Sequence, residues 1–251
     1  MFKRLFQIFF VILLLVSCTS KQTVLEGSAK SLYELINKEL NKERKYIFFG
    51  TTDYKLLSEM IIALQVRYPY STYARESYLL SGEVAYKRKK YGEAIVEYQA
   101  FIENQINHPK VDYATYRIFK SQSKLITDKD KNIQPAKEIL GIFELLTEEY
   151  KYSEFMPETI EIYEKAKKYI LKRAIYIAKF YIKDEKYNSA LGRIDNANIL
   201  IPERVAQSQE AQYIKTFCLI KTSESSKKTD YIKSYIERFP NSPYISELND
   251  L

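Results

Sequence analysis

Two places in this chain have side chains that could do acid–base or nucleophilic chemistry. The first is His108, the single histidine among 251 residues, in the tripeptide Asn107-His108-Pro109. A catalytic histidine needs a partner acid and a nucleophile, and a metal site needs further ligands. Neither pattern is visible around His108. A helix break capped by Asn107 explains the tripeptide better.

The second place is the pair Glu76-Ser77, which is similar to the Glu-Ser pair of lytic transglycosylases. The pair falls in the middle of an expected helix, and no catalytic domain surrounds it. The sequence also has no Walker loop, no Gly-rich phosphate cradle and no cysteine cluster. We therefore predict that the protein is not an enzyme and needs no catalytic metal.

Cys18 carries a different kind of chemistry, because it ends the tetrapeptide Leu-Val-Ser-Cys. Two basic residues, Lys3 and Arg4, precede an apolar run over residues 5–16, which is shorter than the roughly 20 residues of a membrane-spanning helix. The tetrapeptide resembles the bacterial lipobox, in which the chain is cleaved before the cysteine and the sulfur carries a diacylglycerol. The alternative is an ordinary signal peptide in which Cys18 occurs by chance.

We therefore expect a lipoprotein signal peptide over residues 1–17. Cys18 would carry a covalent N-acyl and S-diacylglycerol lipid, with no other cofactor. The next residue is Thr19, whereas lipoproteins retained in the inner membrane usually have Asp there. This difference favours an anchor at the periplasmic face of the outer membrane.

The remaining cysteine and the charge point to ordinary structural roles. With Cys18 lipidated, Cys218 has no disulfide partner, and its apolar neighbours predict a buried, inert thiol. The net charge is +7, but the lysines are scattered among glutamates. The one basic run, at residues 87–90, falls at an expected helix end, where cations are favoured. We predict no binding to nucleic acid.

The elements that must position these side chains are helices. The 251 residues include only 6 glycines and 7 prolines, and the hairpin dipeptides Asn-Gly and Asp-Gly are absent. Apolar residues recur with helical spacing instead. We therefore predict an all-α protein, with a polar loop over residues 128–132 and a long helix over about residues 154–182.

Small residues recur at matching positions of two segments, as in tetratricopeptide repeats. Gly82 and Ala94 have the same separation as Ala178 and Ala190, and small residues at these positions would let two helices approach closely. Equivalent positions at 57, 94, 139, 190 and 228 mark the second helices of five units. We predict an α-solenoid of about five irregular tetratricopeptide (TPR) hairpins over residues 31–251, after a flexible tether over residues 18–30.

Three segments make a more specific resemblance. Residues 67–73 read Arg-Tyr-Pro-Tyr-Ser-Thr-Tyr, residues 107–116 read Asn-His-Pro-Lys-Val-Asp-Tyr-Ala-Thr-Tyr, and residues 187–193 read Tyr-Asn-Ser-Ala-Leu-Gly-Arg. Together with the lipobox, these segments resemble the BamD family, the competence lipoproteins of the outer-membrane β-barrel assembly machinery. The resemblance covers nearly the whole mature chain. It is weaker at Lys151, which replaces a proline, and in the C-terminal unit.

The resemblance implies a non-enzymatic scaffold for inserting β-barrel proteins into the outer membrane. Its C-terminal units would dock on the POTRA domains of BamA, beside other Bam lipoproteins. Its N-terminal groove would receive the targeting strands of unfolded outer-membrane proteins. By their places in the matched motifs, Arg193 would pair with a carboxylate of BamA, and Tyr68, with Lys55 nearby, would contact the targeting strand.

Simpler interpretations of the same residues remain open. Arg193 could be an exposed helix arginine without a partner, and Tyr68 could pack against the next unit. The alternative function is a TPR adaptor lipoprotein in envelope constriction or peptidoglycan coordination. Such adaptors typically carry a coiled-coil segment before the repeats, and none is visible between residues 19 and 31.

Overall fold

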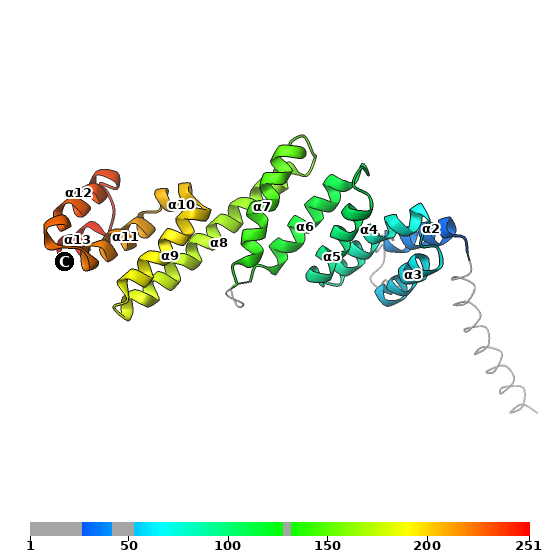
Figure 1. Cartoon of the computed structure of the whole chain (residues 1–251), viewed down its shortest axis with the longest axis horizontal. Coiled ribbons are helices and arrows are strands. Elements are labelled where there is room, and N and C mark those ends of the chain that lie inside the picture. The colour runs from blue at the N-terminus through cyan, green and yellow to red at the C-terminus, as the bar shows by residue number, and fades with distance from the viewer. Residues whose placement is uncertain (1–26, 42–52, 128–131) are drawn as a thin grey trace, which may run out of the picture. The chain divides into compact units, whose positions relative to one another are not determined.

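A computed structural model describes residues 27–41, 53–127 and 132–251 of the chain, and every regular element in these ranges is a helix (Figure 1). The all-α prediction is therefore confirmed. The helices are α2 (Ala29–Leu40), α3 (Tyr54–Arg67), α4 (Thr72–Lys87), α5 (Tyr91–Asn104), α6 (Val111–Leu125), α7 (Gln134–Glu149), α8 (Met156–Lys183), α9 (Tyr187–Leu200), α10 (Pro202–Gln207), α11 (Gln209–Thr222), the 3-10 turn η1 (Ser225–Lys227), α12 (Lys228–Arg238) and α13 (Ile245–Asn249).

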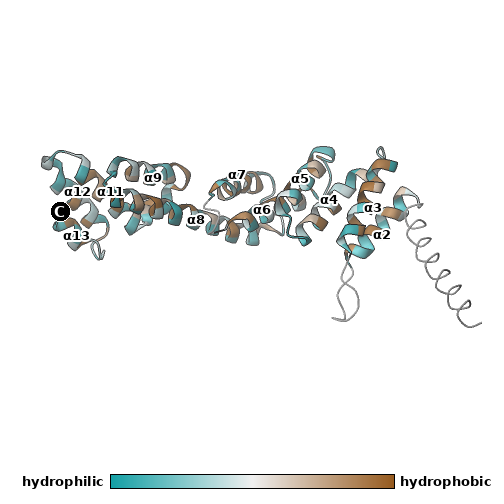
Figure 2. Cartoon of the chain, turned by 90° about the horizontal axis from the view of Figure 1, so that it is seen from below, coloured by the Kyte–Doolittle hydropathy of each residue, from teal (hydrophilic) through white to brown (hydrophobic). Residues whose placement is uncertain are grey.

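The order of the helices agrees with a TPR-like solenoid. The five predicted repeat positions fall on α3, α5, α7, α9 and α12, one on each second helix. The predicted long helix over residues 154–182 is α8, and the solenoid begins at Ala29, two residues earlier than expected. Most of these helices carry both hydrophobic and hydrophilic residues, as helices do that bury one face (Figure 2).

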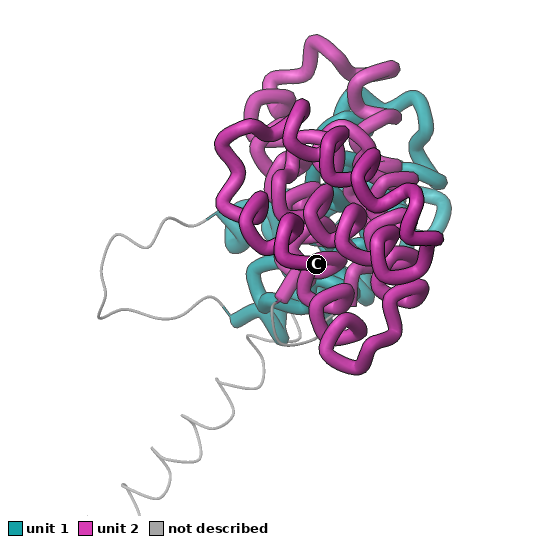
Figure 3. The backbone as a smooth tube through the Cα atoms, turned by 90° about the vertical axis from the view of Figure 1, so that its left-hand side faces the viewer, with its two compact units in different colours: residues 1–121 teal, residues 122–251 magenta. Residues whose placement is uncertain are grey.

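The chain divides into two compact units, residues 1–121 and residues 122–251, and α6 contains the boundary (Figure 3). Each unit has its own buried side chains. The predicted site residues Tyr68 and Lys55 belong to the first unit, and Arg193 belongs to the second.

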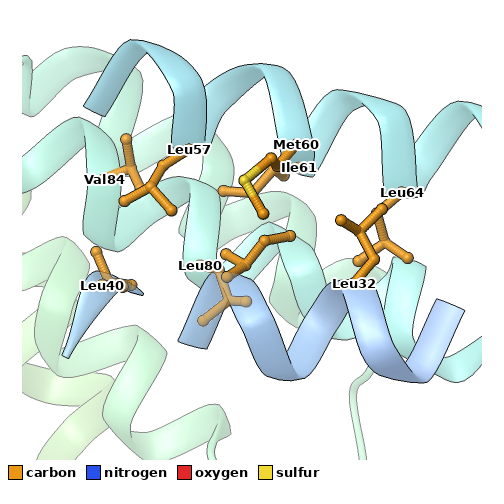
Figure 4. Close-up of a cluster of buried hydrophobic side chains, with 9 residues drawn as sticks. Leu32, Leu40, Leu57, Met60, Ile61, Leu64, Leu80 and Val84 are labelled. Atoms are coloured by element: carbon orange, nitrogen blue, oxygen red, sulfur yellow. The ribbon is translucent and has the colours of Figure 1, made fainter. Parts of the chain in front are cut away.

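The core of the first unit is built from the apolar faces of its first three described helices. Side chains of α2 pack against those of α3 and α4 (Figure 4), and the cluster consists of Leu32, Ile36, Leu40, Leu57, Met60, Ile61, Leu64, Leu80 and Val84. Fully burying one such side chain contributes about 1.5–3 kcal/mol. Helix α2 starts at Ser28, whose side chain accepts a hydrogen bond from the backbone N–H of Ser31. The cap and the cluster together hold α2 on the solenoid.

The small residues of the repeat are buried between paired helices. A Cβ atom added at Gly82 of α4 would lie only 2.4 Å from Cε1 of Tyr98, a fully buried side chain of α5. The equivalent positions in the second unit are Ala178 of α8 and Ala190 of α9, both 0% exposed. The predicted role of these small residues is confirmed.

The repeat extends to the backbone of the turns. Lys89, between α4 and α5, and Glu185, between α8 and α9, both have positive φ angles, of 61° and 58°. In the first turn the N–H of Lys90 donates to the carbonyl of Ala85 at 2.9 Å, and an equivalent bond closes the second turn. Left-handed residues commonly end helices in this way. The basic run at residues 87–90 is thus the turn that reverses the chain.

The fifth unit departs most from the repeat. The one buried residue of α12 is Tyr235, whereas Lys228, which occupies the predicted repeat position, and Ile232, one turn later, stay partly exposed. The Tyr235 hydroxyl lies 2.6 Å from Oγ of Ser242, in the turn after the helix. A tyrosine with a polar partner therefore replaces the packing of small residues here.

A buried ion pair connects α4 with α6 in the first unit. Nη2 of Arg117 donates to Oε2 of Glu83 at 2.9 Å, and Nε of Arg117 lies 2.9 Å from Oε1; the two side chains are 11% and 16% exposed. The hydroxyls of Tyr98 and Tyr113 also donate to Glu83, each at 2.8 Å. The Arg117 guanidinium carbon lies 4.1 Å from the ring centroid of Tyr86. Both charges are thus fully surrounded by partners.

The environment of this pair changes the proton affinities of its members. Burial raises the pKa of Tyr98 and of Tyr113, and the charge of Glu83 raises both further. Burial acts to lower the pKa of Arg117, but Glu83, Tyr98 and Tyr113 together outweigh it and the pKa is raised. The tyrosines therefore stay neutral donors and the arginine stays charged.

We expect Gly82→Ala to lower the melting temperature, because the new methyl group would clash with the ring of Tyr98. Overpacking of this kind costs about 1–3 kcal/mol of the free energy of unfolding. Gly92→Ala is the matched control, since nothing lies within 4 Å of its added Cβ. Thermal unfolding followed by circular dichroism measures both. A Gly82→Ala protein as stable as the Gly92→Ala protein would contradict the packing described here.

We expect Glu83→Gln to destabilise the protein by about 3–5 kcal/mol, because it leaves the Arg117 cation buried without a counter-charge. Adding Arg117→Met to this change should recover part of the loss. Urea unfolding measures the effect. Glu161→Gln is the control, because Glu161 pairs with Lys165 at an exposed position of α8, where such pairs contribute roughly 0–1 kcal/mol. Equal losses in the two single variants would show that burial of the pair is unimportant.

Candidate functional site

The predicted lipidation site lies outside the described residues. This applies to Cys18, to the signal peptide over residues 1–17 and to most of the tether. The described chain begins at Gly27, directly before the cap of α2. No helix in the described part of the chain carries an apolar stretch long enough to span a bilayer.

Tyr68 ends α3 and makes contacts within its own chain. Its backbone N–H donates to the carbonyl of Leu64, and its ring packs against the core cluster of the first unit. Its hydroxyl donates to the carbonyl of Gly27 at 2.8 Å. Packing within the chain therefore accounts for the ring and the hydroxyl of Tyr68. The bond to Gly27 also brings the end of the tether to the end of α3.

Lys55 does not lie near Tyr68, contrary to the prediction. Lys55 is an exposed residue in the first turn of α3, and Tyr68 follows the last turn of the same helix. At 1.5 Å per residue the helix separates them by about 20 Å. The two residues lie at opposite ends of one helix. A single ligand would have to be extended, such as a β-strand of about six residues, to reach both.

Arg193 is an exposed residue of α9, held beside Tyr181 of α8. Its Nη2 lies 3.4 Å from the Tyr181 hydroxyl, and its guanidinium carbon lies 5.6 Å from the centroid of that ring. The bond is long, and Arg193 has no carboxylate partner among the described residues. The tyrosine therefore orients the guanidinium and leaves most of its donors available.

Arg193 also lines a pocket of about 560 Å³ in the second unit. The pocket is formed by the start of α7, the middle of α8 and the last turns of α9, and its lining consists of Asn132, Ile133, Lys137, Ile170, Arg173, Ala174, Ile177, Arg193, Asn196, Ala197, Ile199 and Leu200. Three of these side chains are cations, and no aspartate or glutamate is among them. Chemically, the pocket can bind an anion that has apolar surroundings.

Sequence reasoning did not single out Lys137 or Arg173. Each lies on a different helix from Arg193, and only the packing of α7, α8 and α9 brings the three cations to one pocket. Neither residue has a motif around it. The repeat pairs α8 with α9 as one hairpin. It was the one sequence feature that could have brought Arg173 and Arg193 together.

His108 and Glu76 lie closer together than the sequence suggested. Nε2 of His108 is 4.0 Å from a carboxylate oxygen of Glu76, beyond hydrogen-bonding distance. No hydrogen bond from the described residues shows the expected cap by Asn107; in the turn before α6, Nδ1 of His108 accepts the N–H of Lys110 at 3.1 Å. Ser77 is fully buried, and its hydroxyl donates to the carbonyl of Ala74. The serine therefore has no nucleophilic geometry.

The remaining candidate groups are structural. Cys218 is fully buried in α11, and burial raises the pKa of its thiol to about 11. The predicted inert thiol is therefore confirmed. Within the described ranges, no three histidine, cysteine, aspartate or glutamate side chains gather as metal ligands would.

Comparison with known proteins matches most of this chain to a family of outer membrane lipoproteins. The family model YfiO, described as outer membrane lipoprotein, matches residues 27–201, which include α2 to α9. A protein of Caulobacter vibrioides named outer membrane protein assembly factor BamD is 22% identical over 171 residues. That alignment covers 67% of this chain and 56% of the relative, so the chain spans just over half of the relative's length.

The C-terminal helices, from α10 onward, begin after the region that the family model matches. This agrees with the sequence comparison, in which the C-terminal unit resembles the family least. The matched region covers well over half of the chain and contains both Tyr68 and Arg193. The chain therefore belongs to the YfiO family of outer membrane lipoproteins, and its predicted resemblance to BamD is confirmed.

Proposed function

We propose that the protein is a non-enzymatic scaffold of the outer-membrane β-barrel assembly machinery. Membership of an outer membrane lipoprotein family supports the location, and the name of the Caulobacter relative supports a role in assembly. The observation that carries the proposal is Arg193, an exposed arginine oriented by Tyr181 at the rim of a cationic pocket. Such a group is suited to a protein partner that presents a carboxylate.

The partner of this surface would be the POTRA domains of BamA, with other Bam lipoproteins nearby. A planar guanidinium can bind a carboxylate through two parallel hydrogen bonds, which an ammonium group cannot. Tyr181 restricts the side chain before binding, so less conformational entropy is lost on docking. Arg193 would therefore contribute to orientation as well as to attraction.

The targeting strand of an unfolded outer-membrane protein would lie along α3 of the first unit. Tyr68 and Lys55 mark the two ends of this helix, and an extended segment could contact both. Lys55 would attract an acidic group, while Tyr68 would offer its ring, since its hydroxyl already donates to Gly27. Strand binding at Tyr68 would then take place next to the start of α2.

The anchor would be the lipid on Cys18, inserted in the periplasmic face of the outer membrane. Residues 18–30 would connect the lipid to the solenoid. Gly27 is held by Tyr68 and Ser28 caps α2, so only the part of the tether before Gly27 would be free to span the distance to the bilayer.

Affinity purification tests the proposed function as a whole. The full chain is tagged at its C-terminus, membranes are solubilised gently, and the co-purifying proteins are identified. Recovery of a POTRA-containing barrel protein in stoichiometric amounts is the expected result. Recovery of cell-division or cell-wall components would leave the fold unchanged and move the function to the envelope-adaptor alternative.

We expect Arg193→Glu to weaken binding to BamA POTRA domains by about tenfold or more, because it places like charges together. Arg193→Lys should cost less, since it keeps the charge but loses the planar fork. Lys183→Glu makes the same charge change at the exposed end of α8 and serves as control. Binding of the purified chain is measured by biolayer interferometry. Equal affinity in all four proteins would remove Arg193 from the interface.

We expect Cys18→Ala to abolish incorporation of radiolabelled palmitate and to leave the protein uncleaved or soluble. Cys218→Ala removes the other, buried thiol and should keep the label. Metabolic labelling followed by membrane fractionation gives both measurements. Unchanged labelling and membrane partition in Cys18→Ala would show that the cysteine is not the anchor.

A further inference from the structure

We propose that the pocket between α7, α8 and α9 receives an acidic side chain with apolar neighbours from a protein partner, and that Arg173 holds its carboxylate. The identity of that partner as BamA rests on the proposed function. The chemistry of the pocket does not, because it follows from residues of this chain alone.

The charges of the pocket lack a counter-charge. Lys137 comes from α7, Arg173 from α8 and Arg193 from α9, and no carboxylate is among the residues that line the pocket. Two other cations of α8 have acidic partners: Lys165 pairs with Glu161, and Lys167 pairs with Glu164. Like charges in one concave site repel each other and focus a positive potential. Binding of an anion would relieve that repulsion.

Arg173 is the cation best placed to bind the anion. Its Nε is buried and has no hydrogen-bond partner among the described residues. Its guanidinium carbon lies 5.0 Å from the ring centroid of Tyr176, which restricts the side chain. A buried donor without a partner destabilises a protein, and a buried arginine normally meets a carboxylate. An incoming carboxylate would provide the acceptor that Nε lacks.

The apolar part of the lining argues for a protein segment rather than a free small anion. Ile170, Ala174 and Ile177 of α8 line the pocket together with Leu200 of α9, and Ile199, also in the lining, is 78% exposed. A volume of about 560 Å³ exceeds the need of one carboxylate and is typical of sites that bury a ligand with an apolar body. An acidic residue flanked by leucine-like side chains would cover these isoleucines.

The chain itself offers an alternative source of the carboxylate. Asp128 and Asp130 come shortly before Asn132 in the sequence, and both lie outside the described residues. The double variant Asp128→Asn/Asp130→Asn separates this alternative from a partner. It removes both carboxylates and leaves the three cations unchanged.

A first experiment tests the pocket without any partner protein. The full chain is labelled with ¹⁵N, and the Nε–Hε signal of Arg173 is assigned by its absence in Arg173→Lys. The probes are the capped tripeptides Leu-Glu-Leu and Leu-Gln-Leu, added at millimolar concentration. We expect the Arg173 signal to shift, with saturation, for the glutamate peptide alone, and equally in the Asp128→Asn/Asp130→Asn variant. Equal shifts with both peptides, or none with either, would overturn the proposal.

The loop variant decides which chain supplies the carboxylate. If the Arg173 signal moves on removal of Asp128 and Asp130 without any peptide, and the peptide binds only to that variant, the chain's own loop occupies the pocket. That result would overturn a partner as the occupant.

A second experiment measures binding of the same variants to BamA POTRA domains. We expect Arg173→Gln to weaken binding by about tenfold, and Lys165→Gln, which removes a charge of α8 outside the pocket, to leave it unchanged. Circular dichroism verifies that both variants are folded. Weakening by Arg193→Glu but not by Arg173→Gln would overturn the inference and leave the proposed docking intact. A peptide-dependent shift of Arg173 without any POTRA binding would support the pocket and overturn the proposed docking.

A carboxylate placed inside the pocket provides an independent check. Asn196→Asp puts one on the lining of α9, and Asn198→Asp puts one on the same turn outside the lining. We expect Asn196→Asp to raise the melting temperature relative to Asn198→Asp, because it neutralises part of the cationic cluster, and to weaken POTRA binding at the same time. A lower melting temperature and unchanged binding would contradict the proposed role of the pocket.

Discussion

Tyr98 is the side chain on which the packing of the first unit converges. Its ring fills the space that Gly82 leaves open, and its hydroxyl reaches Glu83, which binds Arg117 of α6. The contact of Gly82 with Tyr98 and the buried charge pair are therefore parts of one arrangement. The helices α4, α5 and α6 cannot change their spacing without either exposing the ring or separating the charges. In a repeat protein each unit contacts only its neighbours in the sequence. Coupled contacts of this kind therefore fix the geometry between successive helices.

The two units use arginine in opposite ways. In the first unit, Arg117 is buried and contacts the carboxylate of Glu83, the hydroxyl of Tyr98 and the ring of Tyr86. In the second unit, Arg173 and Arg193 each lie beside a tyrosine ring, but neither has a carboxylate partner among the described residues. A satisfied arginine fixes a fold, whereas an oriented arginine without a counter-charge is prepared for a ligand. This contrast is the physical basis for placing partner docking in the second unit.

The helical repeat could be predicted from the sequence because its cause is local. The spacing of Gly82 and Ala94, and of Ala178 and Ala190, reflects contacts within one hairpin, so a single sequence reveals them. The ion pair between Glu83 and Arg117 joins residues 34 positions apart on different helices, and no spacing rule predicts it. Tyr113, within the family-like segment at residues 107–116, was the nearest available signal, since its hydroxyl is one of the donors to Glu83.

The errors of sequence reasoning at the site have the same origin. The resemblance implies a cation at Lys55 near Tyr68, but Lys55 lies in the first turn of α3 and Tyr68 follows its last turn. The cationic pocket was missed because three helices contribute one residue each. The sequence favours Asn107 as the polar residue of the helix break, whereas in the structure His108 accepts the backbone N–H in the turn before α6.

The bond between Tyr68 and Gly27 has a mechanical consequence. With the lipid on Cys18 that we propose, the leash between membrane and solenoid ends at Gly27, so its fully extended reach is about 30 Å. A force on the tether would act at Gly27, next to the end of α3, the helix along which a targeting strand would lie. Loss of this one hydroxyl contact would lengthen the tether by only the residue before α2, because the Ser28 cap and the core cluster still hold that helix on the first unit.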